Sequence, residues 1–210
     1  MNKVFLYLYP IKEFSQTFNL GDDYYSRNSF RNPFDVLNEA IQKRYRARDF
    51  KIVFVLYPDK DIYGISLQQG DKIIYTDVTF LQATGYNSDG SEKTKEEIIY
   101  PDEQKIINQL GNVEELVIAG YHAQDCVKRV GEVALSNGIK TIIDLDLTDL
   151  FFNLYKQVDY FRVESYSPER FKTYCLKRFN RYGDKFAEEM FNRNYESEAC
   201  GFKDTNKKLK

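Results

Sequence analysis

Two side chains that could act together as a nucleophile and a base lie four residues apart in the second half of the chain. Cys126 opens a predicted helix over residues 123–137, and His122 is the only histidine. A thiol in the first turn of a helix lies at the positive end of the dipole, which favours the thiolate, and free N–H groups there can hold an oxyanion. His122 could take the thiol proton, or it could be a solvated or capping loop residue. We therefore predict Cys126 as a nucleophile, with His122 as a weaker candidate base.

Cys126 also has an interpretation that needs no chemistry. It falls on one apolar stripe of the predicted helix, where a buried cysteine behaves as a small hydrophobic residue. Asp125 suits a helix N-terminus electrostatically without any catalytic role. The other members of the stripe are Ala123, Val127, Val130, Val133 and Ala134. The residue pattern leaves both interpretations of Cys126 open.

A pair of carboxylates, Asp144 and Asp146, lies at the end of a predicted strand, where binding sites of α/β proteins usually form. The pair could bind a metal or a ligand, although a solvated strand end is the simpler interpretation. The sequence has no His and Cys cluster with zinc spacing and no phosphate-binding glycine loop. It therefore predicts no metal and no cofactor, and Asp146 is kept as a candidate binding residue.

Alternating strands and helices must position these side chains. Apolar runs predict strands at residues 3–9, 52–57, 72–76, 115–119, 140–145 and 158–163. Caps and amphipathic stripes predict helices from Asn32–Pro33, at 102–111, at 123–137 and from Ser167–Pro168, and loops are expected at 15–32 and 85–97. The alternation predicts an α/β fold, a three-layer α/β/α Rossmann-like arrangement with a mainly parallel sheet of five or six strands.

Length and composition set the wider frame. A single domain over residues 1–200 is expected, followed by a flexible tail at 201–210. The net charge of -2 predicts neither nucleic-acid nor membrane binding, and the basic and aromatic C-terminal helix is interpreted as a solvated face. Three cysteines cannot all pair within one chain, and no signal peptide is recognised, so reduced thiols in a cytoplasm are expected.

One segment resembles a known family. From Leu116 to Asp146, a strand ends at a glycine, a cysteine–valine pair opens a helix, and the next strand ends in aspartate. The positions concerned are Gly120, Cys126, Val127, Ala134, Gly138 and Asp146. This spacing resembles the isochorismatase-like cysteine hydrolase superfamily, which includes nicotinamidases and carbamoylsarcosine hydrolases. The resemblance implies that Cys126 is the nucleophile and that the peptide bond between Tyr121 and His122 is cis.

The acid and base of that family are not found in the first half of the chain. Tyr9 stands where the resemblance places the catalytic aspartate, and Ile11 replaces a glutamine, although the following Phe14 is present. The family lysine corresponds to Ile74, or to Tyr75 after a slip of one residue. A phenol with a pKa near 10 is a poor general base at neutral pH. Tyr9, Tyr75 and Tyr121 are therefore candidate binding residues, together with Asp146.

These observations support three hypotheses. The first is an isochorismatase-like fold that has lost standard hydrolysis and binds a small molecule or a protein partner of unknown identity. The alternative is an active cysteine hydrolase of a C–N amide bond, with Cys126 as nucleophile and His122 or a carboxylate from another segment as base. The candidate carboxylates are Asp22, Asp23, Asp59 and Asp61. The third is an oligomeric scaffold, because many members of the family assemble into homo-oligomers.

Overall fold

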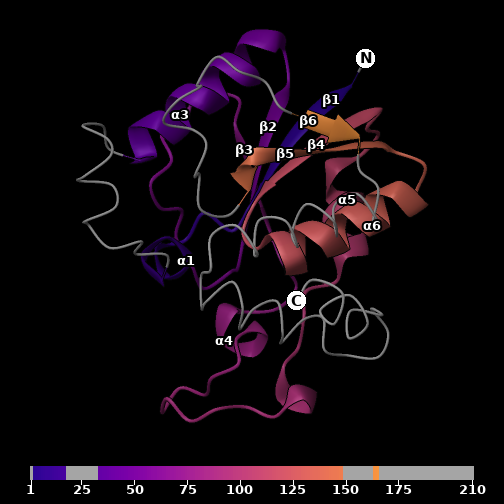
Figure 1. The fold of residues 1–210 in the computed structure, drawn as a ribbon. Helices are drawn as coiled ribbons and strands as arrows, with labels where there is room; N and C mark the ends of the chain where they lie inside the picture. The colour runs from indigo at the N-terminus through magenta and orange to yellow at the C-terminus, as the bar shows by residue number, and fades with distance from the viewer. Residues whose placement is uncertain (1, 18–32, 149–162, 166–210) are drawn as a thin grey trace, which may run out of the picture.

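The computed structural model describes residues 2–17, 33–148 and 163–165 of the 210-residue chain. Six strands form one sheet in the order β3-β2-β1-β4-β5-β6 (Figure 1). The strands are β1 (Lys3–Leu8), β2 (Lys51–Leu56), β3 (Lys72–Tyr75), β4 (Glu115–Gly120), β5 (Lys140–Thr148) and β6 (Val163–Ser165). The pairs among the first five strands are parallel, and only β6 runs antiparallel to its neighbour β5.

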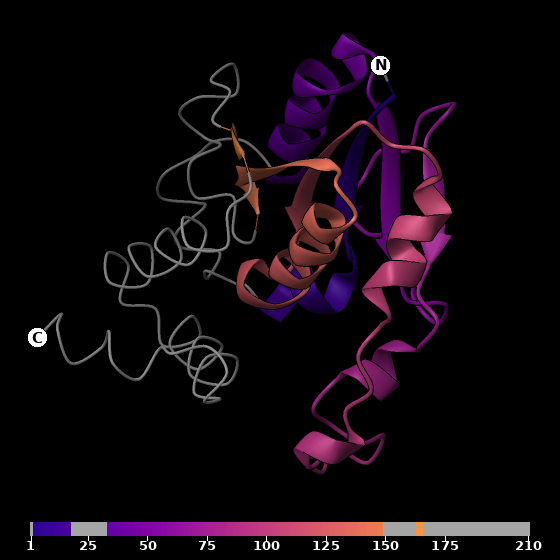
Figure 2. The ribbon, with the colours of Figure 1, turned by 90° about the vertical axis from the view of Figure 1, so that its right-hand side faces the viewer.

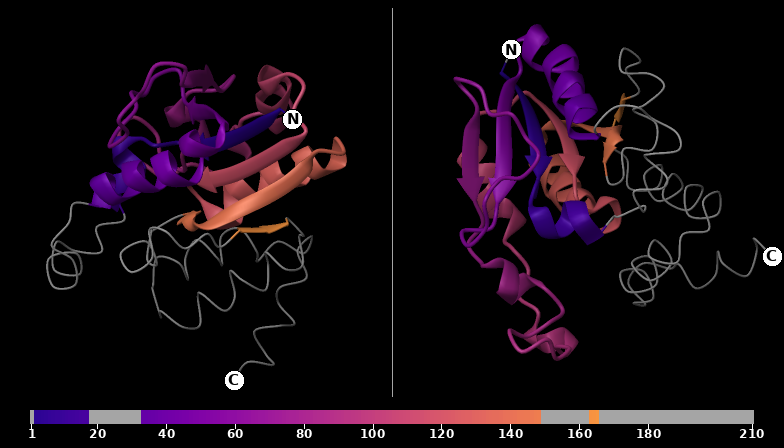
Figure 3. Two further views of the ribbon diagram at one scale, coloured as in Figure 1. Left: turned by 90° about the horizontal axis from the view of Figure 1, so that it is seen from above. Right: turned by 90° about the vertical axis from the view of Figure 1, so that its left-hand side faces the viewer.

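Helices cover both faces of the sheet, which gives the predicted three-layer architecture (Figure 3). Helix α3 (Pro33–Arg44) packs on one face through residues such as Leu37 and Ile41. Helices α5 (Glu103–Leu110) and α6 (Lys128–Ser136) pack on the other face. The central strands are buried on both faces, so their sequences are continuous apolar runs rather than alternating ones. The predicted fold class is therefore confirmed.

Several local predictions differ from the structure. The loop expected at 15–32 begins with the end of a short helix, α1 (Lys12–Thr17), because the sequence Lys-Glu-Phe-Ser-Gln-Thr contains no strong helix breaker. The segment expected to be a loop at 85–97 ends in a short 3₁₀ turn at Lys95–Glu97, where Thr94 and Glu97 form a capping box.

Part of the expected organisation lies outside the described residues. This applies to the helix from Ser167–Pro168, to the boundary at residue 200, and to the last predicted strand up to Val163, where β6 begins. Within the described part of the chain, no helix is long and apolar enough to cross a membrane.

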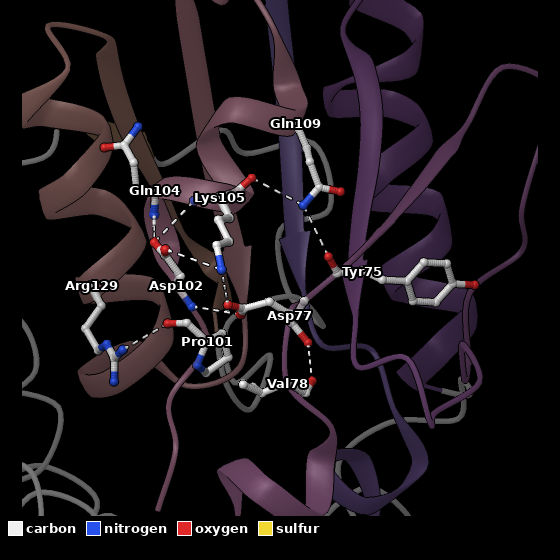
Figure 4. A network of polar contacts seen from close by, with 10 residues as sticks. Tyr75, Asp77, Val78, Pro101, Asp102, Gln104, Lys105, Gln109 and Arg129 are labelled. Carbon is white, nitrogen blue, oxygen red and sulfur yellow. Dashed lines mark hydrogen bonds and ion pairs between the residues drawn. The ribbon is translucent and has the colours of Figure 1, made fainter.

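An arm formed by residues 78–101 projects from the carboxyl end of β3 and returns to the start of α5 (Figures 1 and 2). It contains the one-turn helix α4 (Phe80–Ala83), which Thr79 and Gln82 cap reciprocally. The two ends of the arm are tied together, because the Asp77 carboxylate accepts hydrogen bonds from the Asp102 backbone at 3.1 Å and from Lys105 Nζ at 2.8 Å (Figure 4). Asp102 is also the N-cap residue of α5, so its hydrogen bond to Asp77 fixes the start of this helix relative to β3.

Candidate functional site

Cys126 lies at the carboxyl edge of the parallel sheet, in the connection between β4 and α6. The predicted helix over 123–137 begins there as a π-helical turn, Ala123–Val127, before α6 continues it. The side chain of Cys126 is 8% exposed and belongs to the buried cluster that includes Tyr9, Tyr57 and Ile74. The thiol is therefore part of the buried core on this face of the sheet.

The resting charge of the thiol differs from the expectation based on the helix dipole. Burial raises the pKa of Cys126 well above the ordinary value of a thiol, and the Asp125 carboxylate adds to this rise. The guanidinium of Arg129 and the backbone hydrogen bond with His122 act in the opposite direction but are smaller effects. Desolvation therefore outweighs the helix dipole, and Cys126 is a neutral thiol at neutral pH.

Tyr9 follows β1 and is fully enclosed, with 1% of its surface exposed. Its backbone has a φ of 54°, its N–H donates to the Val55 carbonyl at 2.9 Å, and its ring stacks on Tyr57 with centroids 4.6 Å apart. Burial, followed by the nearby Cys126 and Tyr57, raises the pKa of the Tyr9 phenol well above its ordinary value. Tyr9 thus lies in the same buried cluster as Cys126 and stays protonated there.

The two positions considered for the family lysine lie on opposite faces of β3. Ile74 is buried in the cluster that contains Cys126, whereas the side chain of its neighbour Tyr75 is 49% exposed and points away from α5 (Figure 4). This follows from the alternation of side chains along a strand. Lys72 is exposed at the start of β3, on the same face as Ile74, and donates to the Gln109 carbonyl of α5 at 3.0 Å. The structure therefore does not bring the ring of Tyr75 to the thiol.

The peptide bond between Tyr121 and His122 is cis, as the resemblance predicts. The Tyr121 ring is buried against Tyr7, on the face of the sheet that α3 covers, so it does not belong to the cluster around Cys126. The imidazole of His122 packs edge-on against Phe14, with centroids 4.6 Å apart. Burial lowers the pKa of His122 to about 3. A base this weak is a poor acceptor for a thiol proton.

The single histidine makes this pKa directly measurable. We expect the imidazole resonance of His122 to titrate with a midpoint near 3 in place of the ordinary 6.5, because desolvation disfavours the cation. Between these two values the unfolded chain binds more protons than the folded one, so the free energy of unfolding should fall as the pH drops through that window. An NMR titration of the folded protein checks this, and a midpoint near 6.5 would show that the ring is solvated.

Charged side chains whose contacts with one another the sequence did not predict lie near Cys126. Arg129 lies 3.7 Å from the Asp125 carboxylate and forms a closer ion pair with Glu103 at the start of α5. Its Nη2 atom donates to the Pro101 carbonyl at 3.3 Å (Figure 4), and its guanidinium lies 4.2 Å from the centre of the Tyr100 ring. The i, i+4 spacing of Asp125 and Arg129 on a helix was the available signal.

Asp144 corrects the expectation of a solvated strand end. It is fully buried on β5, where both carboxylate oxygens accept from Arg44 Nη1 at 3.1 Å and one accepts from the Tyr45 hydroxyl at 2.5 Å. Arg44 is the last residue of α3 and Tyr45 follows it, so their contacts with Asp144 join that helix to β5. Asp146 lies further along the same strand. Among the described residues, no group of three or more His, Cys, Asp or Glu side chains could hold a metal.

Of the four loop carboxylates considered as bases, two lie within the described residues and two do not. Asp22 and Asp23 lie outside the described residues. Asp59 follows β2 and accepts the Phe80 backbone N–H at 2.7 Å, so it caps the start of α4, and Asp61 is an exposed residue of the same loop. The carboxylate that acts most strongly on Cys126 is instead that of its neighbour Asp125, whose charge raises the pKa of the thiol.

Comparisons with known proteins give structural similarity only. No protein-family model matches the sequence, and no curated protein matches it. A carbamoylsarcosine amidase from Thermoplasma acidophilum shares 13% identity over 73% of this chain and 87% of that chain, with a TM-score of 0.42. An isochorismatase-like hydrolase from Alkaliphilus metalliredigens shares 14% identity over 75% and 85% of the two chains, with a TM-score of 0.43.

A third similar structure is the YcaC gene product from Escherichia coli, described as an octameric hydrolase of unknown specificity. It shares 10% identity over 100% of this chain and 95% of that chain, with a TM-score of 0.41. The similarity in all three cases concerns the path of the chain. The fold class of this protein rests on its own strand order and helix layers.

Proposed function

We propose that this protein has an isochorismatase-like fold without standard hydrolytic activity, and that it binds a small molecule or a protein at the carboxyl edge of its sheet. One observation carries the proposal. The two positions at which the family resemblance expects an aspartate and a lysine, Tyr9 and Ile74, are both buried with Cys126 in one apolar and aromatic cluster.

The chemistry of a cysteine hydrolase explains why these two residues matter. The nucleophile must lose its proton before or during attack, and a positioned base normally takes that proton. A buried phenol with a raised pKa is already protonated and cannot take it, and the side chain of Ile74 has no ionisable group. Since the thiol of Cys126 is itself protonated, the standard arrangement supplies neither a thiolate nor its base.

The test is turnover by the purified protein on nicotinamide and N-carbamoyl amides. We expect rates far below about 1 s⁻¹, the lower end of ordinary enzyme turnover, because loss of a nucleophile–base partner typically costs several powers of ten. Cys126→Ala provides the matched control, since any trace activity that survives it does not come from this site. Turnover at about 1 s⁻¹ or faster that Cys126→Ala abolishes would overturn the proposal.

The alternative function is an active hydrolase of a C–N amide bond with Cys126 as nucleophile. A specific observation favours it, namely that the Asp125 carboxylate lies on the same helical turn as Cys126 and acts on its thiol electrostatically. In this alternative Asp125 would replace the missing aspartate as base. The same turnover measurement separates the two functions.

We also propose a cellular location, a set of excluded partners and an oligomeric state for this protein. The composition, with a net charge of -2 and three cysteines, supports a cytoplasmic protein that binds no nucleic acid, membrane or cofactor. Assembly into a homo-oligomer is proposed from the resemblance, and the Escherichia coli YcaC protein is described as an octamer. Sedimentation of the full chain tests this directly, and a monomer at all concentrations would contradict it.

A further inference from the structure

Four aromatic rings lie one against the next at the carboxyl edge of the sheet. The inner two, Tyr9 and Tyr57, are buried in the cluster that contains Cys126 and stack with centroids 4.6 Å apart. The outer two, Phe14 and Phe80, are only partly buried and meet edge to face at 5.6 Å. Each outer ring also contacts one inner ring, at 6.3 Å for Phe14 on Tyr9 and at 5.6 Å for Phe80 on Tyr57. The outer pair therefore covers the inner pair.

The two outer rings come from two short helices that are far apart in the sequence. Phe14 belongs to α1, which follows β1, and Phe80 is the first residue of α4 in the arm (Figure 1). Helix α4 has no buried residue, and the N–H of Phe80 donates to the Asp59 carboxylate at 2.7 Å. Elements this small, with few buried contacts, open at a lower free energy than the core of a domain. The two phenylalanines can therefore separate while the sheet stays intact.

One lysine holds the two helices together. Lys60, in the loop after β2, forms an ion pair with Glu13 of α1 at 2.5 Å, and its Nζ atom lies 4.6 Å from the centre of the Phe80 ring. The side chains of Lys60 and Glu13 are 23% and 40% exposed, so salt weakens this pair. A pair this exposed adds little to the stability of the whole fold, but it is enough to shift the balance between two positions of a short helix.

We propose that Phe14 and Phe80 form a gate over this site and that Lys60 is its latch. With the latch closed, as in this structure, the side chain of Cys126 is 8% exposed. Separation of α1 from α4 exposes the inner rings and the thiol to a ligand at the carboxyl edge of the sheet. The inference rests on the proposed function for the place where a ligand binds, but the gate itself requires neither a ligand nor turnover.

The test is the rate at which iodoacetamide alkylates Cys126 in the full-length protein at constant pH, read by mass spectrometry on the peptide that contains Cys126. Lys60→Met keeps the apolar stem and removes the charge, so the gate opens more often and alkylation should be about 5-fold faster. Loss of a nearby cation by itself disfavours the thiolate and would slow the reaction. The sign of the change therefore decides, and an unchanged or slower rate overturns the inference.

Salt provides a second readout of the same ion pair. In the unchanged protein, alkylation should become faster as the salt concentration rises to about 1 M, because screening weakens the contact between Lys60 and Glu13. In Lys60→Met the rate should no longer depend on salt. Equal salt dependence in the two proteins would contradict the role of Lys60 as a latch.

Two controls separate opening of the gate from general loosening. Lys140→Met removes an ion pair with Glu115 at the opposite edge of the sheet, where β4 and β5 begin, and should leave the alkylation rate unchanged. Amide hydrogen exchange in Lys60→Met should become faster in α1 and α4 but not in β4. Faster exchange in β4 as well would indicate global unfolding and would overturn the inference.

The gate and the proposed function can fail separately. Turnover of the amide substrates together with the expected effects of Lys60→Met would contradict only the proposed function. Absence of turnover together with absence of those effects would contradict only the gate.

Discussion

Replacing Asp144 with asparagine is expected to lower the free energy of unfolding by about 3–5 kcal/mol. The carboxylate is fully buried and accepts from Arg44 and Tyr45, and Arg44 is itself only 2% exposed. Asparagine keeps the volume but removes the charge, so the buried guanidinium loses the ion pair with this carboxylate. Removing one partner of a buried ion pair costs much more than the net stabilisation that the intact pair provides.

Chemical denaturation at constant pH measures this loss, and Asp77→Asn is the matched control. Asp77 also pairs with a cation, but the side chains of Asp77 and Lys105 are 29% and 59% exposed, so its replacement should cost less than about 1 kcal/mol. The double variant Arg44→Met with Asp144→Leu should recover part of the loss, because both charges of the pair are then removed together. Equal effects of Asp144→Asn and Asp77→Asn would contradict this reasoning.

A single methyl group at Gly120 is expected to destabilise the protein by about 3 kcal/mol or more. Gly120 ends β4 and pairs with Leu8 of β1, and its φ of +109° is one that residues with a side chain rarely adopt. A Cβ atom there would lie 2.2 Å from the Leu8 carbonyl oxygen and 2.6 Å from its nitrogen. Since these are backbone atoms of the central strand, the two strands would have to separate.

Two effects destabilise Gly120→Ala, the positive φ and the clash of the new Cβ with Leu8, and Gly138→Ala measures the first of them alone. Gly138 also has a positive φ, +73°, but no atom lies within 4 Å of the position of its Cβ. It should therefore cost only the backbone penalty, about 1–2 kcal/mol. Thermal or chemical unfolding of both variants provides the comparison, and a similar small loss in each would mean that β1 and β4 have room to adjust.

The strands of this fold could be predicted because a strand buried on both faces has a continuous apolar sequence. The run at 115–119 corresponds to β4, and the run at 3–9 corresponds to β1 followed by Tyr9. The partner of Asp144 could not be predicted in this way. Arg44 lies 100 residues earlier in the chain, and only the packing of α3 against β5 brings the two together.

The properties of the site were harder to predict than its position. The helix dipole indicated a thiolate at Cys126, but burial reverses this, and the cluster that buries the thiol includes Tyr9 and Tyr57, which follow other strands. The contact between Asp125 and Arg129 had a local signal in their i, i+4 spacing. Glu103 had no such signal, because its contact with Arg129 depends on how α5 lies beside α6.

The ionisation of Cys126 tests the central claim most directly, because a standard cysteine nucleophile requires a thiolate, or a base at the position that Tyr9 occupies. Thiolate ultraviolet absorbance of the protein, minus that of Cys126→Ala, reports this single group across the pH range in which the fold is stable. We expect no thiolate at neutral pH and an onset above the ordinary range of thiols, since burial raises the pKa of Cys126. A thiolate already present at neutral pH would contradict the claim that the standard nucleophile has been lost.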